Sequence, residues 1–245
     1  MQSTNPAFSQ SFAQNFDYAG TRSNTMTVQG TAMKAFVLLA IMMTTAGYSW
    51  TRVAEGSMSI GLAVGSGIGA FVLAMITIFR PTASPYTSPL YAGLQGICLG
   101  AISRIFEARF PGIVVQAVAL TGGVTFLMLF IYATRLIRVT GQLTAAIVSA
   151  TGAIFLVYMA SWIMSMFGTR IPYIHDSGPI GIGFGLFVVG LAAFNLLLDF
   201  DLIEQGSNQG WAKSMEWYGA FALMITLVWM YRQILDLLRK INGRD

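Results

Sequence analysis

The stretch Gly190–Gly206, GLAAFNLLLDFDLIEQG, carries an acid at the end of a strongly apolar run. A charged side chain at the centre of a bilayer costs from about 2.5 to more than 10 kcal/mol, so such an acid faces protein or water. Asp199 is therefore the first candidate for a functional residue. Asn195 precedes it by one helical turn on the same face, and a buried Asn–Asp stripe can hold a proton. Alternatively, Asp199 only ends the span at the membrane interface.

The composition is that of an integral membrane protein. Of the 245 residues, 55% are hydrophobic and 10% are charged, whereas a soluble domain carries about 25% charged residues. The net charge of +4 suits basic flanks in the cytoplasm. The sequence has no basic cluster interleaved with aromatic residues outside the spans, so nucleic-acid binding is not expected. Cys98 is the single cysteine, so no intrachain disulfide can form.

Seven apolar segments follow a polar N-terminal stretch, and about 20 residues suffice to span a bilayer. Residues 1–30 are rich in Ser, Asn, Gln and Thr and are predicted to form a flexible tail. A seven-helix transmembrane domain is predicted for residues 31–241, followed by a C-terminal tail at 242–245. The segments are 31–50, 58–79, 90–106, 112–134, 143–167, 178–199 and 217–238. The sequence thus predicts an all-α integral membrane protein.

Three local features predict how these spans begin and pack. Lys34, near the start of the first segment, is expected to snorkel to the interface. The segment 81–89 contains three prolines and is predicted not to be helical throughout. Small residues recurring every fourth position in the second segment predict close approach of a neighbouring helix; they are Gly61, Gly65 and Gly69.

The last segment differs from the others because only residues 217–231 are free of charge, which is short for a span. It either crosses the membrane inside a shell of other helices or is re-entrant. In both cases its polar end, which contains Arg232, Gln233 and Asp236, requires protein or water around it. Arg232 and Asp236 are four residues apart and could pair, or each could anchor the helix at the interface.

The basic residues suggest an orientation. The largest cluster, Arg239, Lys240 and Arg244, is C-terminal, and the positive-inside tendency places that end in the cytoplasm. A re-entrant last segment would put both termini inside.

Enzymatic chemistry is disfavoured. His175 is the single histidine, so Ser66, between two glycines, has no evident base partner. One histidine and one cysteine are too few for a zinc or haem site. We expect neither an enzyme nor a bound cofactor.

The acids after the apolar run offer a candidate calcium site. Asp199 and Asp201, with Glu204 beyond them, could supply the hard oxygen ligands that calcium prefers. However, Asp201 points about 200° around a helix from Asp199. A solvated interfacial loop is the favoured interpretation of Asp201 and Glu204.

Three stretches, together with the D-x-x-L-I pattern at Asp199–Ile203, point to a known family. They are SPLYAGLQGICLGAISRIFEARFPGIVVQAV (88–118), HDSGPIGIGFGLFVVGLAAFNLLLDFDLIEQG (175–206) and MEWYGAFALMITLVWMYRQILDLL (215–238). The chain resembles the Bax inhibitor-1/YccA family, also called the transmembrane Bax-inhibitor-motif family, in its prokaryotic branch.

This resemblance implies six helices around a central seventh, and a pH-sensitive calcium leak across the inner membrane. It implies that an acid on the sixth helix shares a proton with an acid on the seventh, and that an arginine ending the second helix pairs with them. Carried over by position, the sixth-helix acid is Asp199, the arginine is Arg80 and the seventh-helix position is Gln233. A glutamine cannot titrate, so Asp236, three residues on, is the candidate substitute. Calcium would be a permeant ion rather than a cofactor.

The family resemblance leaves a second function open. Bacterial members include one that resembles a substrate and modulator of a membrane-bound AAA+ protease, and in that reading the polar tail is the handle. A proton-coupled carrier for a small solute is a third, weaker option.

Overall fold

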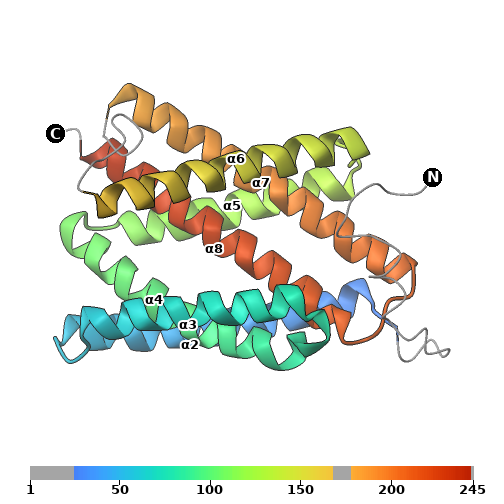
Figure 1. Ribbon diagram of the computed structural model, residues 1–245, viewed down its shortest axis with the longest axis horizontal. Helices are drawn as coiled ribbons and strands as arrows, with labels where there is room; N and C mark the ends of the chain where they lie inside the picture. Colours follow the sequence, from blue (N-terminus) through green and yellow to red (C-terminus); the bar gives the residue numbers. More distant parts are fainter. Residues whose placement is uncertain (1–24, 168–177, 244–245) are drawn as a thin grey trace. The chain divides into compact units, whose positions relative to one another are not determined.

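The computed structural model describes residues 25–167 and 178–243. These residues form seven α-helices and one short 3-10 helix, with an isolated bridge as the one β-type pairing within the described ranges. In chain order (Figure 1) they are α2 (Val28–Ala54), α3 (Ile60–Phe79), η3 (Pro81–Ala83), α4 (Ser84–Arg109), α5 (Ile113–Ala133), α6 (Gly141–Met166), α7 (Pro179–Asn208) and α8 (Met215–Asn242).

Some predictions fall outside the described ranges. They concern the N-terminal tail up to Asn24, the loop that contains His175, and Arg244. The predicted start of the membrane domain at residue 31 comes close to the observed start of α2 at Val28.

The helices carry the surface expected of a membrane protein. Six of them are long and apolar enough to cross a bilayer, the exception among the seven described helices being α4. Large apolar side chains point outward from α3, α5 and α6, where a soluble protein would carry polar groups; examples are Phe71, Val115, Phe126, Phe155 and Leu156. The prediction of an all-α membrane bundle is confirmed, and the arrangement of six helices around one stays a prediction.

The last helix is longer than expected. α8 is one continuous helix of 28 residues, which at 1.5 Å per residue is about 42 Å long and exceeds the hydrocarbon core of a bilayer. A re-entrant segment requires a turn inside it, and α8 has none. The re-entrant alternative is therefore wrong for this structure.

The proline-rich segment is also more helical than predicted. Pro81 opens η3, and α4 starts at Ser84 rather than near Leu90. Pro85 lies in the first turn, where a missing N–H costs no intrahelical bond. Pro89 lies inside the helix and removes one backbone donor, a loss that transmembrane helices tolerate.

The chain divides into two compact units. Among the described residues, the first comprises 25–104 together with 199–224, and the second comprises 105–167 and 178–198 together with 225–243. α7 and α8 each contribute to both units.

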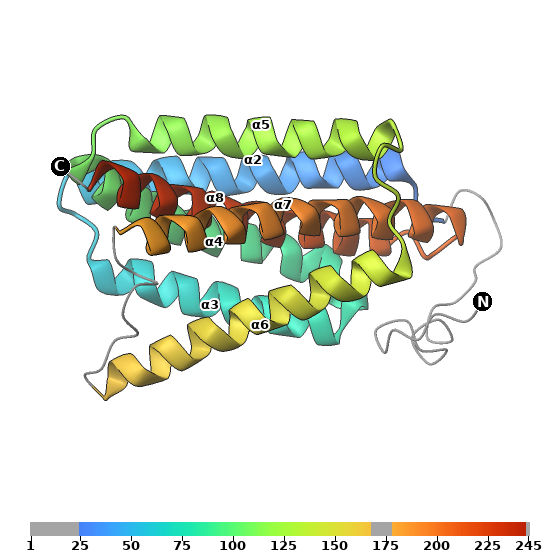
Figure 2. The same ribbon diagram turned by 90° about the horizontal axis from the view of Figure 1, so that it is seen from above.

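In the first unit, α4 lies between α2 and α3 (Figure 2). Gly96 and Gly100 of α4 lie against the backbone carbonyls of Met42 and Ala46 in α2. The Ser49 hydroxyl also donates to the carbonyl of Ile97, at 2.7 Å. Small residues permit this close approach of two helix backbones.

The predicted glycine stripe of α3 does not lie against the backbone of another helix. A Cβ built at Gly65 would meet nothing within 4 Å, one at Gly61 would meet only Ser59 of its own chain segment, and one at Gly69 would meet a side-chain carbon of Leu94. The tight helix pair is α2 with α4, since it is the α4 glycines that face another backbone.

The second unit has its own apolar core. Ile147 and Ile154 of α6 pack against Val188 and Leu191 of α7, with Trp229 of α8 at the margin. Two of the sequence candidates, Asn195 of α7 and Gln233 of α8, are bonded to residues of this core or packed against it, Leu191 and Tyr158.

Candidate functional site

Asp199 lies inside α7 and is partly buried. The helix continues beyond it to Asn208, so Asp201 and Glu204 are helical residues and the predicted interfacial loop is wrong. An apolar residue one turn on, Ile203, keeps this end of α7 packed against its neighbours. Because Asp199 and Asp201 are two residues apart on a helix, their carboxylates point in different directions.

The turn of α7 that follows Asp199 packs against the start of α8. Ile203 of this turn lies next to Gly219, and Tyr218 packs against the cluster that contains Ile203. Tyr218 packs on Phe221, whose ring in turn meets Tyr91 of α4 edge to face at a centroid distance of 5.1 Å. The turn of α7 that follows Asp199 thus lies beside a run of three aromatic rings that links α8 to α4.

Arg80 is exposed at the C-terminal cap of α3. It borders a shallow groove lined otherwise by apolar side chains, including Phe79 and Met75. Within the described ranges the guanidinium forms no ion pair. The structure therefore does not bring Arg80 and Asp199 together as the resemblance implies.

Two polar candidates in the second unit are bonded to α6. The hydroxyl of Tyr158 donates to Gln233 Oε1 at 3.0 Å. Asn195 donates to the hydroxyl of Thr151 at 2.9 Å and to the carbonyl of Leu191 at 2.9 Å. The side chain expected to be a seventh-helix acid is thus a glutamine held by a tyrosine.

Asp236 pairs with cations on its C-terminal side. Its Oδ1 accepts from Arg239 at 2.6 Å, and its Oδ2 lies 3.1 Å from the ammonium of Lys240. Lys240 is almost fully buried and also donates to the carbonyl of Gly181 at 3.3 Å. The partners of Asp236 are therefore one turn after it, and the alternative in which it pairs with Arg232, one turn before, is not observed; Arg232 is exposed.

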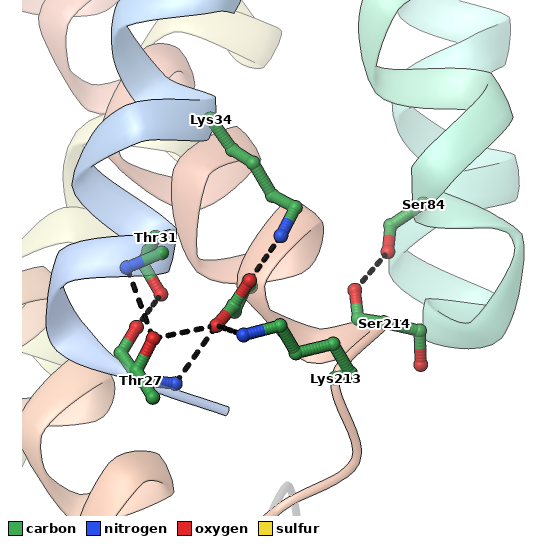
Figure 3. A network of polar contacts seen from close by, with 8 residues as sticks. Thr27, Thr31, Lys34, Ser84, Lys213 and Ser214 are labelled. Carbon is green, nitrogen blue, oxygen red and sulfur yellow. Dashed lines mark hydrogen bonds and ion pairs between the residues drawn. The ribbon is translucent and has the colours of Figure 1, made fainter. Parts of the chain in front are cut away.

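Glu216, in the first turn of α8, is a carboxylate of the first unit with several bonding partners. It is fully buried, and it forms ion pairs with Lys34 of α2 and with Lys213, whose ammonium lies 2.8 Å away (Figure 3). Its Oε1 also accepts from the backbone N–H of Thr27 at 2.9 Å and from the Thr27 hydroxyl at 2.8 Å. Lys34 further lies 5.6 Å from the centre of the Trp217 ring.

This arrangement also caps α2. Thr27 is the N-cap residue, and its hydroxyl oxygen accepts from the N–H of Gly30 at 3.0 Å while donating to Glu216. The first turn of a helix exposes N–H groups and carries partial positive charge. Glu216 therefore places one negative charge between two lysine ammonium groups and the N-terminus of α2.

The residues before α2 continue this attachment. Thr25 and Ala212 form an isolated antiparallel bridge, and the N–H of Met26 donates to the carbonyl of Trp211 at 2.6 Å. The Met26 side chain is buried in an apolar cluster; its other members are Ile203, Trp211 and Met215. We call Thr25–Thr27 the strap, because it crosses from α2 to the turn between α7 and α8.

Comparison with known proteins gives one match. A model of the Bax inhibitor 1 like family matches residues 5–243. The chain belongs to this family. Searches of curated proteins and of solved structures gave no significant match. The family resemblance inferred from the sequence is thereby confirmed over nearly the whole chain, and the prokaryotic branch stays a prediction.

Sequence reasoning missed Glu216 and the pairing of Lys34 with it. Lys34 was expected to snorkel to the interface, but it pairs with Glu216. Each residue could have been noticed on its own, because Lys34 and Glu216 are each a lone charge at the start of an apolar helix. Their pairing joins the first described helix to the last, and such a distant contact leaves no local pattern in the sequence.

A search of the described residues finds no group of three or more His, Cys, Asp or Glu side chains that could hold a metal ion. Asp199 and Asp201 stay a prediction as calcium ligands.

Proposed function

We propose that this Bax inhibitor 1 like protein is a pH-sensitive calcium leak channel of the inner membrane, without enzymatic activity, gated by protonation of Asp199. The observation that carries the proposal is the family membership of nearly the whole chain, combined with an acid inside the apolar helix α7. Acids in transmembrane helices mark ion and proton pathways because their burial is costly.

The proposed mechanism uses the position of Asp199 beside the start of α8. The ionised carboxylate attracts cations and accepts hydrogen bonds, whereas the protonated form has lost its charge. Protonation would therefore change how strongly α7 holds the first turns of α8, which pack against the turn after Asp199. A shift of α8 between two positions would then change the leak.

Calcium flux into proteoliposomes tests this function. Purified protein is reconstituted with a calcium indicator inside the vesicles, and flux is measured from pH 5 to pH 8. We expect Asp199→Asn to abolish the pH dependence, and Glu55→Gln, which alters an exposed ion pair with Arg52, to leave it unchanged. Unaltered flux and pH dependence in Asp199→Asn would show that the proposed gate is wrong.

One observation favours a second function. The position where the family resemblance places a titratable acid is Gln233, which is bonded to Tyr158. This departure suits a membrane protein that does not transport ions and instead binds and modulates a membrane-bound AAA+ protease. Deleting residues 2–24, which spares the strap, tests it: turnover or protease binding should change while calcium flux is absent in both forms.

A further inference from the structure

The Glu216 network sets a fully buried carboxylate against two lysines, and the proposed gate does not use it. It joins three parts of the first unit: the strap, the start of α2 and the start of α8 (Figure 3). Removing one partner of a buried ion pair leaves an uncompensated charge and strongly destabilises a protein. The network is therefore a firm attachment point rather than a surface ion pair.

The strap is also held by its backbone and by one apolar side chain. The Thr25–Ala212 bridge and the Met26–Trp211 hydrogen bond fix it to the turn after α7. The Met26 side chain lies between two glycines, one near the end of α7 and one near the start of α8; they are Gly206 and Gly219. Both glycines lack the Cβ that would otherwise occupy the space of this methionine.

The same packing leads to Asp199. Ile203 lies one helical turn after Asp199 and packs both on Met26 and on Gly219, the residue after Tyr218. The strap thus contacts the turn of α7 that follows Asp199 and the turn of α8 that contains Tyr218. Moving the strap would free these two turns from a common support.

We propose that the strap, anchored on Glu216, clamps the end of α7 to the start of α8 and thereby sets the position of the α8 turn around Tyr218 relative to the α7 turn that follows Asp199. Glu216 is in this view a positioning residue. Docking of the strap keeps the surroundings of Asp199 closed, and its release opens them. The flux part of the test rests on the proposed function, and the labelling part does not.

A disulfide lock tests the clamp. Thr25 and Ala212 face each other in an antiparallel bridge flanked by the Met26–Trp211 hydrogen bond, a non-hydrogen-bonded position with Cα atoms about 4.5 Å apart, which suits a disulfide. We expect Thr25→Cys with Ala212→Cys, in a Cys98→Ala background, to lose at least about 80% of calcium flux on oxidation and to recover it on reduction. Thr25→Cys alone is the control. Equal flux in the locked and reduced forms would overturn the clamp as a control of the leak.

A second measurement needs no transport. Asp199→Cys in the Cys98→Ala background is labelled with a water-soluble maleimide, with and without Glu216→Gln. We expect Glu216→Gln to raise the labelling rate at least about fivefold, and Glu55→Gln to leave it unchanged. Thr27→Val, which keeps the backbone N–H but removes the hydroxyl bond to Glu216, should give a smaller increase. Equal labelling rates in all variants would overturn the positioning role, whereas a protein without calcium flux but with faster labelling would overturn only the proposed function.

Discussion

The carboxylate of Glu216 lies directly over the Cα of Gly30, so that a Cβ at position 30 would overlap its oxygen atoms. A helix start and a buried acid from another helix can approach this closely only because the helix residue has no side chain. The first turn of α2 and the first turn of α8 are therefore matched to each other in shape as well as in charge.

Gly30→Ala should break this match. The added methyl group displaces the Glu216 carboxylate from Thr27 and Lys34, and we expect a loss of about 2–3 kcal/mol, the scale of overpacking a filled site. Gly47→Ala in the same helix is the control because nothing lies within 4 Å of its Cβ, and it should be neutral or stabilising by up to about 1 kcal/mol. Unfolding of both variants in detergent compares them, and equal stability would contradict the close contact.

Glu216→Ala should be among the most destabilising substitutions in the first unit. It leaves Lys34 and Lys213 without their shared carboxylate, and we expect a loss of about 3 kcal/mol. Glu55→Ala removes an exposed acid with one partner at 3.5 Å and should cost less than about 0.5 kcal/mol.

A double-mutant cycle separates the ion pair from the rest of the network. Lys34→Met combined with Glu216→Gln should be more stable than the sum of the single effects predicts, because the double variant buries no unmatched charge. Additive losses would show that Lys34 and Glu216 do not act together.

Gly100→Ala should disrupt the pairing of α2 with α4. Its Cβ would overlap the backbone of Ala46, which cannot move as a flexible side chain can. We expect a loss of about 3 kcal/mol or failure to accumulate in the membrane. Gly65→Ala, with nothing within 4 Å of its Cβ, should accumulate normally, and similar behaviour of the two variants would contradict the close packing.

Gln233→Glu should add a titratable group beside Tyr158. The carboxylate keeps an acceptor for the Tyr158 hydroxyl, which now donates to Gln233 Oε1. In the calcium-flux assay, we expect the pH profile of Gln233→Glu to gain a second transition that the parent protein lacks. Gln233→Met, which removes the acceptor, separates loss of the hydrogen bond from gain of the acid. An unchanged profile in Gln233→Glu would exclude this position from the gate.

Particular residues show how far sequence reasoning reaches in this protein. The helical spans could be predicted because their apolar length is a local property, and Asp199 stood out because an acid is rare in such a run. The close packing of α4 on α2 could not be predicted, because Gly61 and Gly96 look alike in the sequence. Only Gly96 faces the backbone of another helix. Asp236 has basic residues within one turn on both sides along the helix, and in the structure it pairs with those that follow it, including the buried Lys240. Helix α7 continued past Asp199 because apolar residues such as Ile203 and Leu202 pack against the cluster around Met26.

The Lys34–Glu216 pair joins residues 182 positions apart in the chain. Because ribosomes add about 5–20 residues per second, α2 is synthesised roughly 9–36 s before its partner acid. During that interval the ammonium group of Lys34 has to be hydrated or held by another group, and Met26 has no cavity to enter. The first helix, α2, therefore cannot reach its final place in the membrane until the last helix, α8, has been translated.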